Sequence, residues 1–564
     1  MPDVHVTIDG TEIAVPSGST VLEAARIAGI EVDTLCDHPA IEPIGACRIC
    51  LVEVEKQRAL QPACTFPVSD GMVVHTRSEK VVGARKFVLQ LLFSERNHFC
   101  MFCQMSGSCE LQNLAYKYEL DHWQFNRPMP TYAVDASREY FVMDHNRCIL
   151  CRRCIRVCDE LVGNGTLGLK NRGADAVIIA DLDVPFGESS CISCGTCLQV
   201  CPTGALMDRA SAYMGASDQV ERVKSRCMGC PVGCGTELVV RDGQVIRVEG
   251  DWDAEPNKGL LCVVGRFDPQ HEVRERVRKP LVRQGDAWSI ADGEAAYGLV
   301  AEKVAAAGDS VATVASGFVT LEEAQALGSA VRGRKFYMYD LPQTDRTATM
   351  ADLDEADLFI VTEMDLSLDF QVAGMAVKRG VRKRGARLIL VGEGENGLAD
   401  WASMRVGRAD LAKVIAMAKS AERPVVVSGP AGLAAAREIV SAVPAASLAS
   451  FAPGGNGRGL CDAGFGQTYA GDAAKVTVVV AGETSQVEPG LLDALKKQEF
   501  VVVVASYREP WDQVADVILP MPTAFEKSGT TVCADGQAGQ VVAAMSTRVP
   551  TLEATIGMVA EAIR

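Results

Sequence analysis

The sequence lacks any apolar run long enough to span a membrane, and its first ten residues lack the positive start and apolar stretch of an export signal. We therefore expect a cytoplasmic protein without direct membrane insertion. Basic residues are also in deficit, since 56 Lys and Arg stand against 72 Asp and Glu, for a formal net charge of -16. Such an acidic chain repels phosphate backbones and anionic lipid, which makes nucleic acid and membrane surfaces poor partners.

Cysteine is almost absent from the second half of the chain. After residue 262 only Cys461 and Cys533 remain, whereas 19 of the 21 cysteines come earlier. The 564 residues exceed a typical domain several times, so three to five domains are expected, in two functionally different halves. Disulfide frameworks are typical of small secreted domains, and this chain is long and shows no export signal. The cysteines are therefore expected to hold metal centres.

The first set of cysteines follows a small strand-and-helix unit. We expect a hairpin over residues 6–15 that turns at Asp9-Gly10, then a helix that begins with a Thr20/Glu23 capping box. Four cysteines follow in the pattern C-x10-C-x2-C-x13-C: Cys36, Cys47, Cys50 and Cys64. Four thiolates on loops beside a small sheet are what a 2Fe-2S cluster needs. Zinc also binds four cysteines, but zinc ribbons usually show two C-x2-C pairs, and only one is present here.

The second set combines one histidine with three closely spaced cysteines: His98, Cys100, Cys103 and Cys109. Three thiolates leave a 4Fe-4S cluster one ligand short, and His98 carries the only nearby imidazole. A lone histidine is more often a surface or core residue than a ligand. Beside three cysteines we interpret it as the fourth ligand.

Two matching runs of the form C-x2-C-x2-C-x3-C are the strongest signal in the sequence. They are Cys148, Cys151, Cys154 and Cys158, then Cys191, Cys194, Cys197 and Cys201. This double spacing is typical of bacterial two-cluster ferredoxins, in which the fourth cysteine of each run ligates the other cluster. We therefore predict one 4Fe-4S cluster on Cys148, Cys151, Cys154 and Cys201. A second is predicted on Cys191, Cys194, Cys197 and Cys158.

Four arginines crowd the first of these runs: Arg147, Arg152, Arg153 and Arg156. Positive charge close to a cluster favours its reduced state. A solvated face or a docking patch explains the same residues equally well, and the sequence does not choose between the two interpretations.

The last set spans a second predicted hairpin, which turns at Asp242-Gly243 and brings a distant cysteine back to three others. Its members are Cys227, Cys230, Cys234 and Cys262. A 4Fe-4S cluster is expected, with a structural zinc as the alternative. Together, 19 cysteines and His98 supply the ligands of one 2Fe-2S and four 4Fe-4S clusters.

Several motifs resemble known families. GACRICLVEVE at 45–55 resembles the plant-type ferredoxin-like domain of the large iron-sulfur subunit of respiratory complex I and its relatives. Those subunits carry a 4Fe-4S cluster with one histidine and three cysteines, but their histidine usually stands four residues before the first cysteine. Here His98 stands two before Cys100, which resembles the small diaphorase subunit of NAD-linked nickel-iron hydrogenases. The stretch that begins at Cys227 and ends with NKGLLCVVGRF (257–267) resembles the N-terminal 4Fe-4S domain of molybdopterin oxidoreductases.

The second half alternates short apolar strands with helix-like stretches. The expected strands are 357–362, 387–391, 424–428, 476–480 and 500–505. Uniformly apolar strands of this kind indicate parallel sheets covered on both faces, in a Rossmann-like α/β architecture. ADVILP (515–520) and FEKSGTTVCADGQ (525–537) resemble the middle domains of molybdopterin oxidoreductases.

No substrate-converting site is expected in this half. Residues 339–350 offer no cysteine where molybdenum-binding relatives place a metal ligand, so no molybdopterin and no catalytic residue are predicted. Cys461 and Cys533 are interpreted as small residues of a core or loop. The glycine-rich SGPAG at 428–432 lacks a full phosphate-binding fingerprint, and no recognisable motif binds FMN or NAD.

The predicted fold class is therefore multidomain, α+β followed by α/β. The expected parts are a β-grasp 2Fe-2S ferredoxin-like domain (1–78), a helical segment whose 4Fe-4S site combines one histidine with three cysteines (79–135), a two-4Fe-4S ferredoxin domain (136–216), a 4Fe-4S domain of molybdopterin oxidoreductase type (217–274) and a catalytically silent Rossmann-like body (275–564).

The resemblance implies an oxidoreductase subunit that relays electrons from an FMN/NAD(P)H flavoprotein to a partner active site. It also implies a small thioredoxin-like 2Fe-2S subunit and either hydrogenase or quinone-module subunits as partners. The NH-x-C spacing favours an NAD(P)-linked hydrogenase, electron-bifurcating or not. A complex I-type NADH-quinone oxidoreductase and an NAD-linked formate dehydrogenase are the alternatives, and a zinc-bearing structural scaffold is the alternative from another class.

Overall fold

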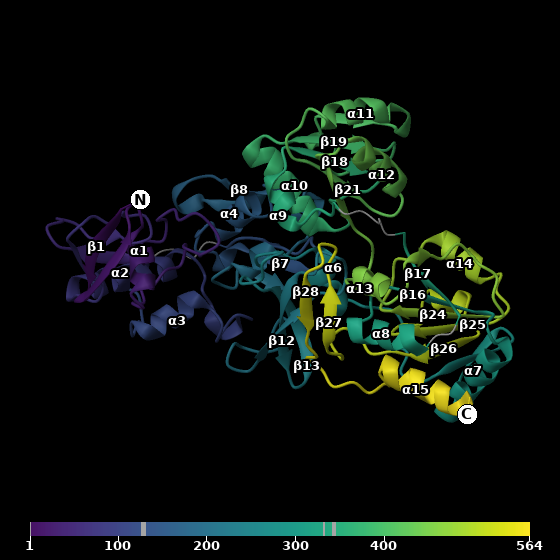
Figure 1. The fold of residues 1–564 in the computed structure, drawn as a ribbon. Helices are drawn as coiled ribbons and strands as arrows, with labels where there is room; N and C mark the ends of the chain where they lie inside the picture. The colour runs from purple at the N-terminus through teal and green to yellow at the C-terminus, as the bar shows by residue number, and fades with distance from the viewer. Residues whose placement is uncertain (1, 126–130, 331–332, 341–345, 564) are drawn as a thin grey trace. The chain divides into compact units, whose positions relative to one another are not determined.

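The computed structural model describes residues 2–125, 131–330, 333–340 and 346–563 (Figure 1). The chain forms two compact units, Met1–Val220 and Glu221–Arg564, and each is described here by itself. The finer division into five domains stays a prediction. Among the described residues, no helix combines the length and apolar character that crossing a bilayer requires.

Unit one begins with a mixed five-stranded sheet in the order β2-β1-β5-β3-β4. The strands are β1 (Asp3–Ile8), β2 (Thr11–Pro16), β3 (Leu51–Val54), β4 (Gln61–Pro62) and β5 (Met72–His75), with helix α1 (Val21–Ile27) after β2. Asp9 and Gly10 both have positive φ, 46° and 85°, as a tight hairpin turn requires. Thr20 and Glu23 form the expected capping box. The predicted hairpin and helix start are therefore confirmed.

Helices follow the first sheet. They are α2 (Glu79–Glu95), the short 3-10 helix η1 (Cys100–Phe102) and α3 (Glu110–Lys117). Arg85 of α2 is buried and joins three segments, because its guanidinium donates to the Tyr118 hydroxyl at 2.8 Å and to the Leu51 carbonyl at 2.9 Å, and lies 3.5 Å from Asp33. This buried ion pair attaches the helical segment to the first sheet.

The double cysteine run lies on two short helices beside small sheets. The helices are α4 (Arg153–Glu160) and α5 (Thr196–Gln199), with 3-10 turns η2 (His145–Arg147), η3 (Gly173–Asp175) and η4 (Phe186–Glu188). A three-stranded sheet has the order β10-β7-β6, and β8 pairs with β9. The strands are β6 (Val134–Asp135), β7 (Phe141–Asp144), β8 (Leu167–Lys170), β9 (Val177–Ala180) and β10 (Leu206–Asp208).

Unit two opens with an antiparallel meander of β11 (Glu221–Arg226), β12 (Gly235–Arg241) and β13 (Gln244–Gly250). Asp242 and Gly243 turn between the last two strands with φ of 51° and 70°, so the predicted second hairpin is confirmed. Helix α6 (Val263–Arg266) and η5 (Asp268–Gln270) then follow Cys262.

The larger sheet of this unit has eight strands in the order β15-β14-β26-β25-β24-β16-β17-β23. Strands β26, β25, β24, β16, β17 and β23 run parallel, and β14 and β15 add an antiparallel edge. Their bounds are β14 (Leu281–Gln284), β15 (Ala287–Ile290), β16 (Val311–Ala315), β17 (Arg334–Tyr337), β23 (Gln467–Thr468), β24 (Val476–Gly482), β25 (Val501–Ala505) and β26 (Val517–Pro520). The helices around it are α7 (Gly293–Ala307), α8 (Leu321–Ala330), α13 (Gly457–Asp462), α14 (Pro489–Leu495) and α15 (Leu552–Ile563), with η8 (Trp511–Gln513).

The smaller sheet is wholly parallel, in the order β20-β19-β18-β21-β22. Its strands are β18 (Leu358–Thr362), β19 (Arg387–Val391), β20 (Met404–Val406), β21 (Pro424–Ser428) and β22 (Ser447–Ser450). Its helices are α9 (Met350–Glu355), α10 (Gln371–Arg384), α11 (Leu411–Ala418) and α12 (Leu433–Ala442), with η6 (Ala399–Trp401) and η7 (Arg408–Asp410).

Alternate residues of the central strand β18 pack on opposite faces of this sheet. Phe359 and Val361 share a core with α10, whereas Leu358 and Ile360 share a core with α11 and α12. All five strands predicted from apolar runs are present, as β18, β19, β21, β24 and β25, and they lie in parallel sheets.

A two-stranded hairpin completes the second unit. It consists of β27 (Gly529–Val532) and β28 (Ala538–Val541), and Figure 1 shows it in yellow beside the meander. The Ser225 hydroxyl at the end of β11 accepts from the Val542 amide at 2.9 Å and donates to the Val542 carbonyl at 3.2 Å. Segments about 300 residues apart in sequence therefore meet at the start of the fifth cysteine set.

Candidate iron-sulfur cluster sites

The first set gathers four buried thiols in the loop that connects α1 to β3 and in the turn after β4. The sulfur atoms of Cys50 and Cys64 lie 3.3 Å apart, and the Cys47 amide donates to the Cys36 sulfur at 3.4 Å. Cys36 also interacts by side-chain hydrogen bonds with Cys47 and Cys64, which lowers its pKa and raises theirs. Cys36, Cys47, Cys50 and Cys64 therefore form one continuous sulfur group, whose donor chemistry fits an iron centre.

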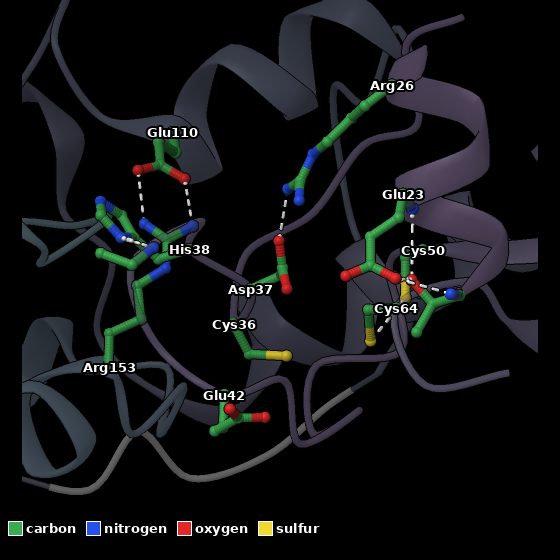
Figure 2. Close-up of polar contacts among 12 residues, drawn as sticks. Glu23, Arg26, Cys36, Asp37, His38, Glu42, Cys50, Cys64, Glu110 and Arg153 are labelled. Atoms are coloured by element: carbon green, nitrogen blue, oxygen red, sulfur yellow. Dashed lines mark hydrogen bonds and ion pairs between the residues drawn. The ribbon is translucent and has the colours of Figure 1, made fainter. Parts of the chain in front are cut away.

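Charged side chains fix the loop that carries Cys36. Figure 2 shows Arg26 of α1 pointing at Asp37, at a distance of 2.5 Å. From the other side, Arg156 of α4 donates to the backbone carbonyls of Cys36 and Glu42. These charge-assisted hydrogen bonds hold the cysteine backbone before any metal binds.

The second set surrounds one small cavity. His98, Cys100, Cys103 and Cys109 all line it, from the α2–η1 connection, from η1 and its end, and from the residue before α3. Burial is the main reason that the pKa of His98 falls to about 4 and that of Cys109 rises to about 12. The imidazole is therefore neutral at pH 7, as a metal ligand must be.

The orientation of His98 leaves one ring nitrogen free. Its Nε2 is buried and has no hydrogen-bond partner among the described residues. An interaction with the Leu92 backbone partly offsets the fall in the pKa of His98. A ligating histidine offers one ring nitrogen to the metal and makes a hydrogen bond through the other. The orphaned atom, in a cavity with three thiols, fits a 4Fe-4S ligand.

Gly204 forms part of the wall of the same cavity. A Cβ at this position would come within 2.5 Å of the Cys103 sulfur and 3.3 Å of the Arg147 side chain. Only glycine therefore leaves Cys103 in its place. Sequence reasoning did not single out Gly204, because its contact is with a residue about 100 positions away.

The third and fourth sets are brought together in the crossed arrangement. One cavity is lined by Cys148, Cys151, Cys154 and Cys201, and another by Cys158, Cys191, Cys194 and Cys197. Burial raises the pKa of every one of these thiols for which a shift is resolved, and Cys201 adds a like-charge contribution at Cys148 and Cys151. Ionising such buried thiols needs a compensating positive charge, which bound iron would supply.

The two runs have matching backbone geometry. Leu150 and Arg152 have φ of 54° and 59°, and the equivalent Ser193 and Gly195 have φ of 55° and 70°. This left-handed conformation turns amide groups toward the cysteines, so Leu150 donates to the Cys148 sulfur and Ser193 to the Cys191 sulfur, each at 3.4 Å. Amide bonds to cysteine sulfurs stabilise thiolate ligands and tune cluster potentials.

The four arginines beside the first run do not form a solvated face. Arg153 is buried and donates to both carboxylate oxygens of Glu110, at 2.6 and 2.9 Å (Figure 2). Arg156 is buried against the Cys36 loop, and Arg147 pairs with Asp144 at 2.9 Å. The interpretation as a solvated face or docking patch is therefore wrong for Arg153 and Arg156, whereas Arg147 is half-buried and Arg152 is exposed.

The fifth set lies in unit two. Cys227, Cys230, Cys234 and Cys262 line one cavity, which extends to the body of the unit. The Gly229 amide donates to the Cys227 sulfur at 3.4 Å and the Gly265 amide to the Cys262 sulfur at 3.2 Å. Burial raises the pKa of all four thiols, that of Cys262 to about 12. The donor set fits a metal centre for the same reason as the others.

A fifth thiol lies against this set. Cys533, on the turn of the β27–β28 hairpin, is buried and interacts with Cys230 and Cys234. From the sequence we interpreted Cys533 as a small residue of a core or loop, and the only signal for its position was the FEKSGTTVCADGQ motif that contains it. Cys461 lies half-buried on α13. No group of three or more His, Cys, Asp or Glu in the described part of the chain is arranged to hold a metal ion as the side chains stand.

Four family descriptions match the regions that contain these sets. They are the 2Fe-2S iron-sulfur cluster binding domain (2–79), the NADH-ubiquinone oxidoreductase-G iron-sulfur binding region (85–123), the NADH-quinone oxidoreductase subunit 3 ferredoxin-like domain (139–207) and the molybdopterin oxidoreductase Fe4S4 domain (220–272). Over these regions the chain is similar to iron-sulfur subunits of NADH-quinone oxidoreductases.

The curated proteins to which the chain is similar carry several names. An NADH-quinone oxidoreductase subunit of Rhizobium meliloti is 34% identical, over 53% of this chain and 37% of the relative. The NADPH-Fe(3+) oxidoreductase subunit alpha of Geobacter sulfurreducens is 31% identical, over 69% of this chain and 48% of the relative. NADH-quinone oxidoreductase subunit 3 of Thermus thermophilus is 27% identical, over 95% of this chain and 79% of the relative.

The chain thus spans less than half the length of the first two relatives. Among solved structures, a chain of an NAD+-reducing [NiFe]-hydrogenase is 34% identical, with 38% of this chain and 90% of that chain covered and a TM-score of 0.36. The matching domain descriptions indicate 2Fe-2S and 4Fe-4S clusters, and the relatives named above are oxidoreductase subunits.

Proposed function

We propose that this chain is an electron-transfer subunit that relays electrons between an FMN/NAD(P)H flavoprotein and a partner active site in a multisubunit NAD(P)-linked oxidoreductase. The observation that carries this proposal is the grouping of twenty candidate ligands. Four of the five sets line separate cavities, and the first forms a hydrogen-bonded sulfur group. Several separate cluster sites on one chain are what an electron relay requires.

The proposed ligands of the 2Fe-2S cluster are Cys36, Cys47, Cys50 and Cys64. Those of the four 4Fe-4S clusters are His98, Cys100, Cys103 and Cys109; Cys148, Cys151, Cys154 and Cys201; Cys191, Cys194, Cys197 and Cys158; and Cys227, Cys230, Cys234 and Cys262. When bound, these clusters supply one-electron outer-sphere transfer. The chain's own residues space the ligand sets, donate amide hydrogen bonds to the sulfurs and exclude water by burial.

The body of unit two is proposed to have no substrate-converting site, and the electron donor is proposed to be a separate flavoprotein. The sequence offers no recognisable FMN or NAD motif, which supports this division of labour. A small thioredoxin-like 2Fe-2S subunit is proposed as a further partner, by resemblance to the complexes that contain such subunits.

The two main candidate parent complexes differ in the subunits that accept the electrons, which are hydrogenase subunits in one and quinone-module subunits in the other. The two-residue spacing between His98 and Cys100 favours an NAD(P)-linked nickel-iron hydrogenase, which includes electron-bifurcating forms. The relatives named NADH-quinone oxidoreductase subunits support a quinone-linked complex equally. An NAD-linked formate dehydrogenase is a further candidate only if a molybdenum subunit accompanies the chain.

An anaerobic pull-down of the tagged native protein tests the proposal, with iron, nickel, molybdenum and flavin measured on the same sample. Iron and sulfide of about eighteen each per chain are expected from one 2Fe-2S and four 4Fe-4S clusters. FMN with nickel identifies a hydrogenase, and FMN with quinone-module subunits but no nickel identifies a complex I-type enzyme. A colourless protein that contains zinc, without iron, overturns the relay and supports a structural scaffold.

A further inference from the structure

Arg226 occupies the last position of β11, one residue before the first ligand of the fifth set. Its Nε donates to the Gly233 carbonyl at 2.8 Å, inside the loop between Cys230 and Cys234. Its Nη2 donates to the Cys533 sulfur at 2.6 Å, on the turn of the distant β27–β28 hairpin. One guanidinium therefore joins the ligand loop to a hairpin about 300 residues away.

Two glycines make room for this contact. Gly233 has φ of 62°, and a Cβ there would overlap the Cys533 sulfur and approach the Arg226 guanidinium to 2.6–2.7 Å. A Cβ at Gly539 of β28 would overlap the same guanidinium. A larger side chain at either position would displace Arg226 or Cys533. The contact therefore depends on the local absence of side chains from both segments.

Cys533 holds the hairpin against the ligand loop as well as accepting from Arg226. Its thiol donates to the Val232 carbonyl at 3.5 Å, and the next amide, of Ala534, donates to the Pro231 carbonyl at 3.3 Å. Pro231, Val232 and Gly233 are the three residues between the ligands Cys230 and Cys234. The hairpin turn therefore supports the whole three-residue connection.

The atoms that hold the Arg226 guanidinium are neutral, a carbonyl oxygen and a thiol sulfur. Arg226 also lines the cavity of the fifth set. The carboxylate that acts on Cys533 is that of Asp535, which accepts from the Gln537 amide in the hairpin turn. Because these two acceptors carry no negative charge, they do not neutralise the guanidinium. In a partly buried place its positive charge therefore acts strongly on groups that lie close to it.

We propose that Arg226, held in place by Cys533, is a positioning residue that sets a fixed positive charge beside the fifth ligand set and raises the reduction potential of the cluster bound there. The reduced cluster carries one more negative charge than the oxidised cluster, so a nearby cation stabilises it. This inference rests on the proposed function, because it requires a 4Fe-4S cluster on Cys227, Cys230, Cys234 and Cys262.

The test is an EPR-monitored redox titration of the full chain, reconstituted anaerobically. The signal of the fifth cluster is identified as the one lost in Cys262→Ala. In Arg226→Gln we expect that signal to titrate at a lower potential, with a tenfold fall in the ratio of reduced to oxidised cluster at fixed potential, which is ~59 mV for one electron. Arg226→Lys keeps the charge and should recover most of the shift.

Three further variants separate the effect of the charge from an effect on the fold. Arg222→Gln removes the same charge from the same strand, at a side chain that pairs with Glu237 and Glu249 away from the ligand loop, and should leave the potential unchanged. Cys533→Ala keeps Arg226 but removes its acceptor, so we expect a smaller shift in the direction of Arg226→Gln. Cys533→Ser keeps an acceptor and should stay near the wild type.

An unchanged potential in Arg226→Gln, with the cluster retained, overturns the inference. If Arg226→Gln loses the cluster, the Cys533→Ala variant decides the question. An unchanged potential of the fifth cluster in Cys533→Ala then overturns the inference. A potential that falls equally in Arg222→Gln also overturns it, because the effect would then be one of net charge. If Cys262→Ala removes neither iron nor a signal, the ligand assignment has failed instead.

Discussion

Arg156 of α4 donates to the backbone carbonyl of Cys36, 120 positions earlier in the sequence. The same guanidinium donates to the Glu42 carbonyl, and the side chain is buried. Arg156 lies between Cys154 and Cys158 of the double cysteine run, and it therefore holds the loop that carries Cys36. This contact fixes the Cys36 loop relative to helix α4.

Arg156→Ala should destabilise the first unit by about 3 kcal/mol, because two carbonyls lose charge-assisted donors, each bond contributing roughly 1.5–3 kcal/mol. Denaturant unfolding of the reconstituted chain measures this, together with the 2Fe-2S absorbance. Arg172→Ala, at an exposed position of the same region, serves as the control and should unfold like the wild type. Equal stability of the two variants would contradict the role given to Arg156.

His98→Ala should remove one 4Fe-4S cluster, so that iron falls from about eighteen to about fourteen per chain. The reason is that Nε2 is a buried nitrogen without a hydrogen-bond partner among the described residues, in a cavity that three thiols also line. His98→Cys should keep the iron and change the potential of that cluster. His122→Ala, at an exposed histidine, should change neither quantity. Full iron in His98→Ala would exclude histidine ligation.

The crossed ligation predicts a specific pattern in double variants. Cys148→Ala with Cys201→Ala removes two ligands of one cluster and should cost about four iron atoms. Cys191→Ala with Cys201→Ala removes one ligand from each of two clusters and should cost about eight. Iron analysis and EPR spin counting distinguish the two results. If the first double variant instead costs about eight iron atoms and the second about four, each run ligates its own cluster.

Gly204→Ala should impair the His98 cluster while the fold persists. The added Cβ would meet the Cys103 sulfur and the Arg147 side chain. Iron is expected to fall toward about fourteen, or the EPR signal of this cluster alone should broaden or disappear. Gly83→Ala is the matched control, because a Cβ at this position meets nothing within 4 Å. Gly83 lies on helix α2, where alanine is a better helix former than glycine. An unaltered signal in Gly204→Ala would refute the steric argument.

Local patterns were sufficient for much of this fold. The turns at Asp9-Gly10 and Asp242-Gly243, and the capping box at Thr20, depend on backbone conformation and hydrogen bonds within a few residues. The apolar strands of the body were found for the same reason, since burial on both faces leaves no exposed position in a five-residue strand such as β18. The paired cysteine runs also have a short fixed spacing, which a cluster imposes directly.

Other features follow only from packing between distant segments. The sequence could not choose between two interpretations of the arginines, because burial of Arg153 and Arg156 depends on Glu110 and on the Cys36 loop. Gly204 carried no local signal, and for Cys533 the sequence offered only the motif that contains it, since each acts through a contact with residues far away in the chain.

Cysteine spacing alone predicts the number and kind of ligand sets, because metal-binding cysteines must recur at short spacings that bonding geometry allows. The strands and turns whose causes are local could also be predicted from the residues in order. Packing is needed to see which buried atoms lack partners, such as His98 Nε2 among the described residues, and which charges lie inside the protein, such as Arg226 beside Cys533. The physical reason is that burial and long-range hydrogen bonds are properties of packed segments and have no fixed spacing along the chain.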